Sequence, residues 1–171
     1  MERTGLLQLG GKDVTVIGPD IEVGQNAPEF TVHDHDWNQV KALESTQGKV
    51  RIIASLPSLA TGVCDAETRR FNEEAAALGD DVVIYGISAD LPFSLKSWCA
   101  ASGVDKVKVV SDAYDTNFGE KYGVLVKERR ILRRAVFVLD KEGKVVYSDY
   151  MAALGDSPDF EAVLAAARGA L

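Results

Sequence analysis

The chain is poor in the residues that most often carry metal or nucleophilic chemistry, with two cysteines and two histidines among 171 residues. Cys64 and Cys99 lie far apart and form no C-x-x-C pair, which argues against a dithiol reductase. His33 and His35 could share one face of a strand and bind a metal, but no cysteine or third histidine accompanies them. A solvated acidic loop is the simpler interpretation of that segment, and a cysteine–histidine protease has no supporting motif.

A surplus of basic charge and a long apolar run are both missing. The net charge is −7, so electrostatics gives no case for binding nucleic acid or an anionic membrane. No apolar stretch approaches the roughly 18 residues of a membrane span, and the first residues lack the basic segment and apolar core of a secretory signal. We therefore expect a cytoplasmic protein. A permanent structural disulfide is rare in that compartment, which leaves the two thiols inert, metal-bound or redox-active.

The chain does contain an alternation of apolar runs and amphipathic segments typical of one α/β domain over residues 1–171. Short apolar runs predict strands at 6–9, 14–17, 30–32, 50–55, 82–87, 107–110, 135–139 and 145–147. Helical spacing predicts helices at 64–78, 91–101 (capped by Asp90), 116–122 and 159–168. Residues 33–48 are expected to form a loop with a helical turn. This order predicts a thioredoxin-like fold: a mixed central sheet flanked by helices, with an N-terminal β-hairpin.

The most informative segment runs from Pro57 to Cys64, after a buried strand and into an amphipathic helix. A thiol in the first helical turn faces unpaired backbone N–H groups and the positive end of the helix dipole, and both favour the nucleophilic thiolate. Thr61 can bring its hydroxyl to the same place, and Gly62 lets the backbone approach the sulfur closely. The same residues are equally consistent with an inert cysteine that packs as a small apolar side chain on the core face of the helix. By themselves they do not decide between a reactive and an inert Cys64.

The spacing Pro57-x3-Thr61-x2-Cys64 matches the active-site signature of the peroxiredoxins. The sequence resembles the bacterial thiol peroxidases, the atypical two-cysteine members of that family, over nearly its whole length. Three runs carry the resemblance in the right order: 61–72, 87–93 with Trp98-Cys99 following, and 134–140. One position departs from the pattern, because Ala60 stands where the family commonly has Asp, and this puts the fine tuning of the site in question.

The resemblance implies a role for each site residue. Cys64 would be the peroxidatic nucleophile and Cys99 the resolving cysteine, joined to it in an intramolecular disulfide. Thr61 would orient thiolate and peroxide by hydrogen bonding. Arg134 would hold the thiolate by charge and stabilise the oxygens as the O–O bond breaks. Pro57 and Val63 would contribute to the substrate pocket.

Each of these roles has a simpler alternative. Arg134 could be a surface arginine at a strand edge, and Cys99 an inert helix cysteine beside Trp98. Arg133 is an internal control, because neighbours on a strand point to opposite faces.

The resemblance also implies the activity: reduction of hydrogen peroxide and organic hydroperoxides, without metal or organic cofactor, by a homodimer that thioredoxin recycles. A peroxide-responsive redox sensor or regulatory binding module would use the same two cysteines to switch a partner interaction. A thioredoxin-fold interaction protein with inert thiols is a third interpretation. Catalytic turnover of peroxide would distinguish the peroxidase from the redox sensor. Preferential alkylation of Cys64 would distinguish both of these from an interaction protein with inert thiols.

Overall fold

The computed structural model describes all residues, 1–171, as two sheets and the helices that cover them. The strands are β1 (Glu2–Leu9), β2 (Lys12–Ile17), β3 (Thr31–His33), β4 (Gln39–Lys41), β5 (Val50–Ser55), β6 (Val82–Ser88), β7 (Lys108–Ser111), β8 (Leu125–Val126), β9 (Ile131–Leu132), β10 (Ala135–Leu139) and β11 (Val145–Tyr150). The helices are α1 (Gly62–Leu78), α2 (Pro92–Ser102), α3 (Asn117–Lys121), α4 (Phe160–Gly169) and a 3-10 turn, η1 (Glu44–Thr46). None of the helices has the length and apolar content needed to cross a membrane.

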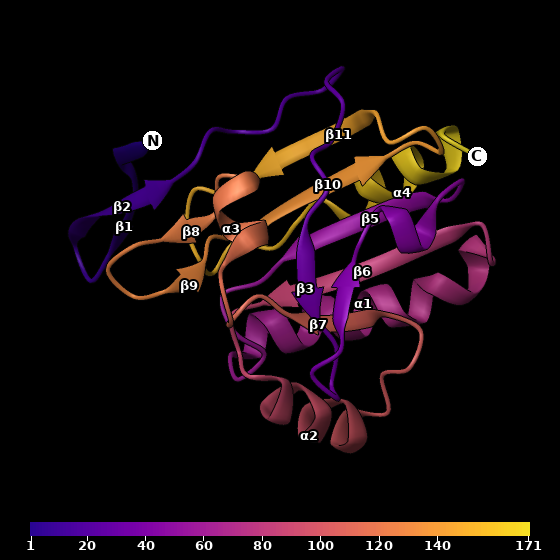
Figure 1. The fold of residues 1–171 in the computed structure, drawn as a ribbon, viewed down its shortest axis with the longest axis horizontal. Helices are drawn as coiled ribbons and strands as arrows, with labels where there is room; N and C mark the ends of the chain where they lie inside the picture. Colours follow the sequence, from indigo (N-terminus) through magenta and orange to yellow (C-terminus); the bar gives the residue numbers. More distant parts are fainter.

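The larger sheet has seven strands in the order β11-β10-β5-β6-β7-β3-β4 (Figure 1). Its central strands β5, β6 and β7 are parallel, while β10, β11, β3 and β4 pair antiparallel at the two sides. A smaller antiparallel sheet, β1-β2-β8-β9, contains the N-terminal hairpin. Its turn is formed by Gly10 and Gly11, both at positive φ, which glycine adopts without steric cost. The mixed sheet and the N-terminal hairpin are both as predicted.

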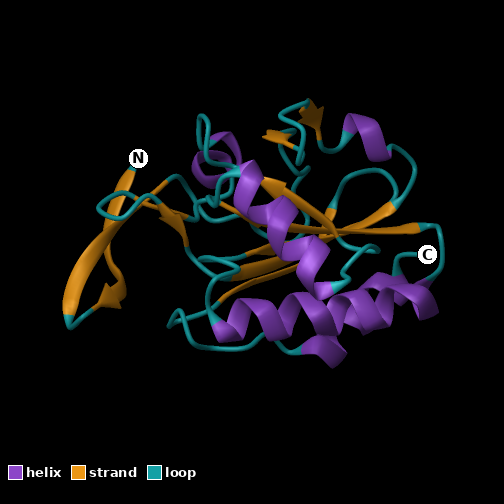
Figure 2. Cartoon of the chain, turned by 90° about the horizontal axis from the view of Figure 1, so that it is seen from below, coloured by secondary structure: helices purple, strands orange, loops and turns teal.

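Alternate residues of the central strands point to opposite faces of the large sheet and build two cores. On β5, Ile52 packs with residues of α1, α2 and α4, whereas Ile53 packs with residues of α3 on the other face. Figure 2 shows the sheet close to edge-on, with helices on both sides and the hairpin projecting beyond its end. The face that carries α1 and α4 also receives the even-numbered residues of β10, Val136 and Val138.

Three short strands were not predicted. β4 lies within residues 33–48, for which only a loop with a helical turn was predicted. The helical turn is present as η1, but the strand was not predicted. Two of the three residues of β4 are exposed, and a polar edge strand of this length has no apolar pattern to reveal it. β8 and β9 have two residues each and form by pairing with β2 and with one another, which only the tertiary fold can specify.

Candidate active site

Cys64 lies in the first turn of α1, as its position after Thr61 predicts. Thr61 is the N-cap: its hydroxyl oxygen accepts a hydrogen bond from the Cys64 N–H at 3.4 Å, and its O–H donates to the Ser58 carbonyl at 3.0 Å. The cap fixes the direction in which the chain enters the helix. Cys64 therefore sits at the positive end of the α1 dipole.

The loop before α1 is held by Asp90. The Asp90 carboxylate accepts hydrogen bonds from the Ser58 hydroxyl at 2.8 Å, the Leu59 N–H at 2.9 Å and the Ser88 hydroxyl at 2.8 Å. The prediction that Asp90 caps α2 is therefore wrong. The N-cap of α2 is Leu91, with no side-chain hydrogen bond, and a proline in the first turn removes one N–H that would otherwise need a partner. Asp90 instead ties the loop to the end of β6.

Arg134 directly precedes β10 and reaches the sulfur of Cys64. Its Nη2 lies 3.1 Å from Cys64 Sγ, its Nη1 donates to Glu67 Oε1 at 3.2 Å, and its Nε donates to the Leu154 carbonyl at 3.0 Å. Cys64 is 0% exposed and Arg134 is 1% exposed, so Arg134 is not a surface arginine. The guanidinium therefore lies against the sulfur in a place away from water, where little solvent screens its charge.

Glu67 completes this buried group, and the sequence did not reveal it as a site residue. Burial raises the pKa of Glu67 to about 7, although the charge and hydrogen bond of Arg134 act in the opposite direction. Its second oxygen, Oε2, has no hydrogen-bond partner. Burial thus disfavours the charged form of the carboxyl, and only one of its two oxygens is paired with Arg134. The signal in the sequence was a carboxylate three residues after Cys64, on the core face of the same helix.

Arg133 points to the opposite face of the sheet, as strand alternation predicts. Its guanidinium lies over the Tyr150 ring, 5.0 Å from the centroid, and its Nε donates to the Met151 carbonyl at 3.3 Å. It is 7% exposed, so it packs against the other core and contributes nothing to the surroundings of Cys64. Arg133 and Arg134 are therefore both deeply buried, but they contact different groups.

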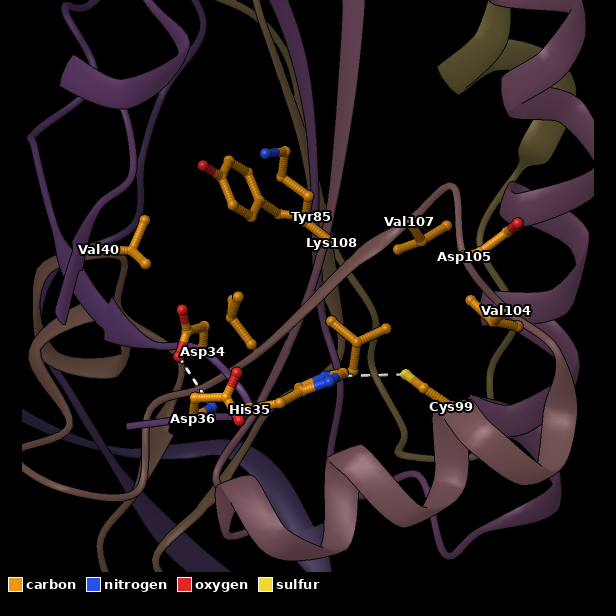
Figure 3. Close-up of a pocket in the computed structure, with 12 residues that line it drawn as sticks. Asp34, His35, Asp36, Val40, Tyr85, Cys99, Val104, Asp105, Val107 and Lys108 are labelled. Atoms are coloured by element: carbon orange, nitrogen blue, oxygen red, sulfur yellow. Dashed lines mark hydrogen bonds between the residues drawn. The ribbon is translucent and has the colours of Figure 1, made fainter. Parts of the chain in front are cut away.

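Cys99 lies on α2 and is half-buried, and neither cysteine is in a disulfide. Its Sγ is 3.8 Å from Nε2 of His35 (Figure 3). Burial raises the pKa of the Cys99 thiol. The neighbouring Trp98 donates its indole N–H to Asp65 at 2.9 Å, and Asp65 directly follows Cys64 on α1. The helices that carry the two thiols are therefore connected by residues adjacent to each thiol.

The remaining predicted residues lie in the loop before α1 and in the first turn of that helix. Pro57 is buried in the loop that follows β5, and Val63 is half-buried in the first turn of α1. Ala60 is exposed, and its N–H donates to the Ser58 hydroxyl at 3.1 Å. No group of three or more His, Cys, Asp and Glu side chains is arranged to hold a metal ion.

The two histidines do not share a strand face. β3 ends at His33, whose ring contacts those of Trp37 and Tyr114, and His35 lies in the following turn.

Comparisons with known proteins show the family of this chain. The Redoxin family model matches residues 22–164. A thiol peroxidase of Bacillus subtilis (strain 168) is 52% identical over 158 residues, which cover 92% of this chain and 93% of that protein. Among solved structures, a peroxiredoxin-like protein from Aquifex aeolicus is 36% identical, with a TM-score of 0.86 over 99% of this chain and 98% of its own. A thiol peroxidase from Chromobacterium violaceum is 26% identical, with a TM-score of 0.82 over 95% of both chains.

The chain therefore belongs to the redoxin family, and its fold is the predicted thioredoxin-like fold. Within that family it is a peroxiredoxin-type enzyme, because relatives named thiol peroxidase match it at 46% identity or more over most of its length. The resemblance drawn from the three sequence motifs is thereby confirmed.

Proposed function

We propose that this enzyme reduces hydrogen peroxide and organic (alkyl or lipid) hydroperoxides to water and alcohols, with Cys64 as the peroxidatic thiolate and Cys99 as the resolving thiol. One observation carries the proposal: a thiol in the first turn of α1 lies 3.1 Å from a buried guanidinium. A buried cysteine that served only for packing would have no need of a desolvated cation at its sulfur, because burying that charge is costly.

In the first step the Cys64 thiolate attacks the terminal oxygen of the hydroperoxide. The S–O bond forms as the O–O bond breaks, and the departing alkoxide takes a proton to become the alcohol, or water when the substrate is hydrogen peroxide. Cys64 is left as a sulfenic acid. Negative charge moves from sulfur to oxygen during this step. Arg134, whose guanidinium stays charged throughout, stabilises this charge on the sulfur before the attack and on the oxygen as the O–O bond breaks. Thr61 orients thiolate and peroxide, and Pro57 and Val63 border the approach.

In the second step the Cys99 thiol attacks the sulfenic sulfur of Cys64. The S–S bond forms, the S–O bond breaks, and hydroxide leaves as water after taking the thiol proton. A reduced thioredoxin dithiol then opens the disulfide by exchange and returns both thiols. The thiolate itself supplies the electrons for peroxide reduction, so this scheme uses no cofactor. We place this cycle in the cytoplasm, where dithiol reductants are kept reduced, and in a homodimer.

A peroxidase assay coupled to thioredoxin, thioredoxin reductase and NADPH tests this proposal. Cys64→Ser should abolish peroxide consumption. Cys99→Ser should keep the first oxidation, accumulate a sulfenic acid that dimedone traps, and block thioredoxin-driven turnover. Iodoacetamide at about pH 6 should label Cys64 before Cys99. A wild-type protein that consumes one equivalent of peroxide and stops would instead be a redox sensor, and normal turnover by Cys99→Ser would contradict the resolving role.

A further inference from the structure

The contact between Cys99 and His35 joins two segments that are distant in the sequence. His35 lies in the turn between β3 and β4, and α2 presents Cys99 to it, so that Nε2 and Sγ are 3.8 Å apart (Figure 3). The turn is fixed by Asp34, whose Oδ1 accepts the N–H groups of Asp36 and Asn38, both at 2.9 Å. The imidazole is therefore held beside the thiol by an ordered turn.

The surroundings of Cys99 do not favour a thiolate by themselves. The pair lies at a cavity of about 420 Å³, whose lining includes the apolar side chains of Val40, Val104 and Val107. Burial raises the pKa of the Cys99 thiol, and no guanidinium or ammonium group hydrogen-bonds its sulfur. Without a base, this thiol stays protonated near neutral pH, and a protonated thiol is a poor nucleophile.

We propose that His35 is the proton acceptor of the resolving thiol, so that Cys99 meets the Cys64 sulfenic acid as a thiolate. This proposal rests on the two-cysteine cycle above. The proton moves from Cys99 Sγ to Nε2 of His35, and the thiolate attacks the sulfur of Cys64. As the S–S bond forms and the S–O bond breaks, hydroxide leaves, and the proton that His35 has accepted returns through solvent to make water. His35 ends neutral, ready for another cycle.

Several charged groups lie around the pair. The titratable and charged groups that line the cavity with the pair are Asp34, Asp36, Tyr85, Asp105 and Lys108, and Lys96 on α2 reaches Asp36. Asp36 is paired with Lys96 at 3.0 Å, and Asp34 also accepts from the Asn38 amide at 3.1 Å. These two carboxylates flank His35 in the chain, and both are held by hydrogen bonds or an ion pair of their own. A cysteine next to such a base is activated in the manner common to cysteine–histidine pairs.

The first test examines the pair without any catalytic cycle. In a Cys64→Ser background Cys99 is the only thiol, and its alkylation by iodoacetamide is measured from pH 5.5 to 9.5 with His35→Gln and with His33→Gln as the matched control. The control should keep a reactive phase that titrates near neutrality. His35→Gln should move this phase to alkaline pH and slow alkylation at pH 7 by about 10²-fold, the low end of general-base effects. Superimposable profiles would overturn the proposal.

The second test examines resolution in the protein with both cysteines. After one equivalent of hydrogen peroxide, disulfide formation is followed by the fluorescence of Trp98, which is adjacent to Cys99. In His35→Gln the oxidation of Cys64 should be unchanged, while disulfide formation slows by about 10²-fold at pH 7 and recovers at alkaline pH. Slowing by the same factor at every pH would mean that the ring only positions Cys99, and would refute proton transfer. Failure of the resolving role itself appears separately, as normal turnover by Cys99→Ser.

Discussion

Replacing Arg134 by alanine, with Arg133→Ala as the matched control, separates the charge at the thiol from the general effect of deleting a buried arginine. Both side chains are deeply buried, both donate to a main-chain carbonyl, and they occupy adjacent positions. Only Arg134 contacts Cys64 Sγ and Glu67. A difference in reactivity between the two variants therefore reports the contact with the thiol.

The size of the effect follows from what each variant loses. A hydrogen-bond donor aimed at developing negative charge in a dry site is worth about 3–4 kcal/mol, so Arg134→Ala should slow oxidation of Cys64 by about 10²–10³-fold. Breaking a buried ion pair typically costs about 3–5 kcal/mol in stability. The loss here should be smaller, because Glu67, whose pKa already lies at about 7, takes up a proton when the cation is removed. Arg133→Ala loses its contact with Tyr150, worth about 0.5–2 kcal/mol, and should oxidise at the wild-type rate.

Stopped-flow oxidation by hydrogen peroxide measures the rate, and iodoacetamide labelling of Cys64 at about pH 6 measures the thiolate population. Chemical denaturation of each variant establishes that both are folded under the assay conditions. The double variant Arg134→Ala/Glu67→Gln removes the unpaired carboxyl and should recover stability but not rate. Wild-type oxidation and labelling by a folded Arg134→Ala protein would refute the reasoning, as would equal losses in the two single variants.

Two further predictions concern stability and motion. Because the pKa of Glu67 is raised from 4.5 to about 7, the native state holds a proton that the unfolded state releases, so the free energy of unfolding should fall as pH rises from about 4.5 to about 7. In urea titrations Glu67→Gln should show a smaller fall of the free energy of unfolding over this pH range. The part of the fall that remains should come from Asp112, whose pKa burial also raises to about 7. Formation of the disulfide should lower amide protection in the first turn of α1 and in residues 91–103, while β5 stays protected; identical exchange in the reduced and oxidised forms would exclude an unfolding step.

The parts of the fold that the sequence predicted are those in which a local pattern coincides with burial. All six residues of β5 are buried, and its apolar run predicted both of its ends. α4 begins after Asp159 because that side chain caps it, accepting from the Ala162 N–H at 3.1 Å, a pairing readable from residue type. The same rule failed at Asp90. A carboxylate before a helix caps it only if nothing else binds it more strongly, and the hydroxyl of Ser58 comes from a distant loop.

The residues of the site also fall into those that a local sequence pattern indicates and those that only the tertiary fold defines. The helix start predicted that Cys64 lies in a first turn close to Thr61, and the structure has both there; the same residues left an inert core cysteine open, and the capping role of Thr61 was not predicted. Strand alternation separated Arg134 from Arg133 but could not say which face meets Cys64; the resemblance to a known family supplied that. Glu67 has a local signal in its spacing from Cys64, but its partner Arg134, like the Cys99 partner of His35, comes from an element far away in the chain, so neither residue's role could be assigned from the sequence.

The different partners of the two thiols suit the order of the proposed cycle. Cys64 must be a thiolate before peroxide arrives, and the guanidinium of Arg134 provides a charge that does not vary with pH in the physiological range. Cys99 has the opposite requirement, because a permanent thiolate there would compete for peroxide and be oxidised without reaching Cys64. An imidazole can accept the thiol proton and return it, so it activates Cys99 without fixing it in the charged form. His35→Arg should therefore make Cys99 itself sensitive to hydrogen peroxide, detectable as dimedone labelling in a Cys64→Ser background.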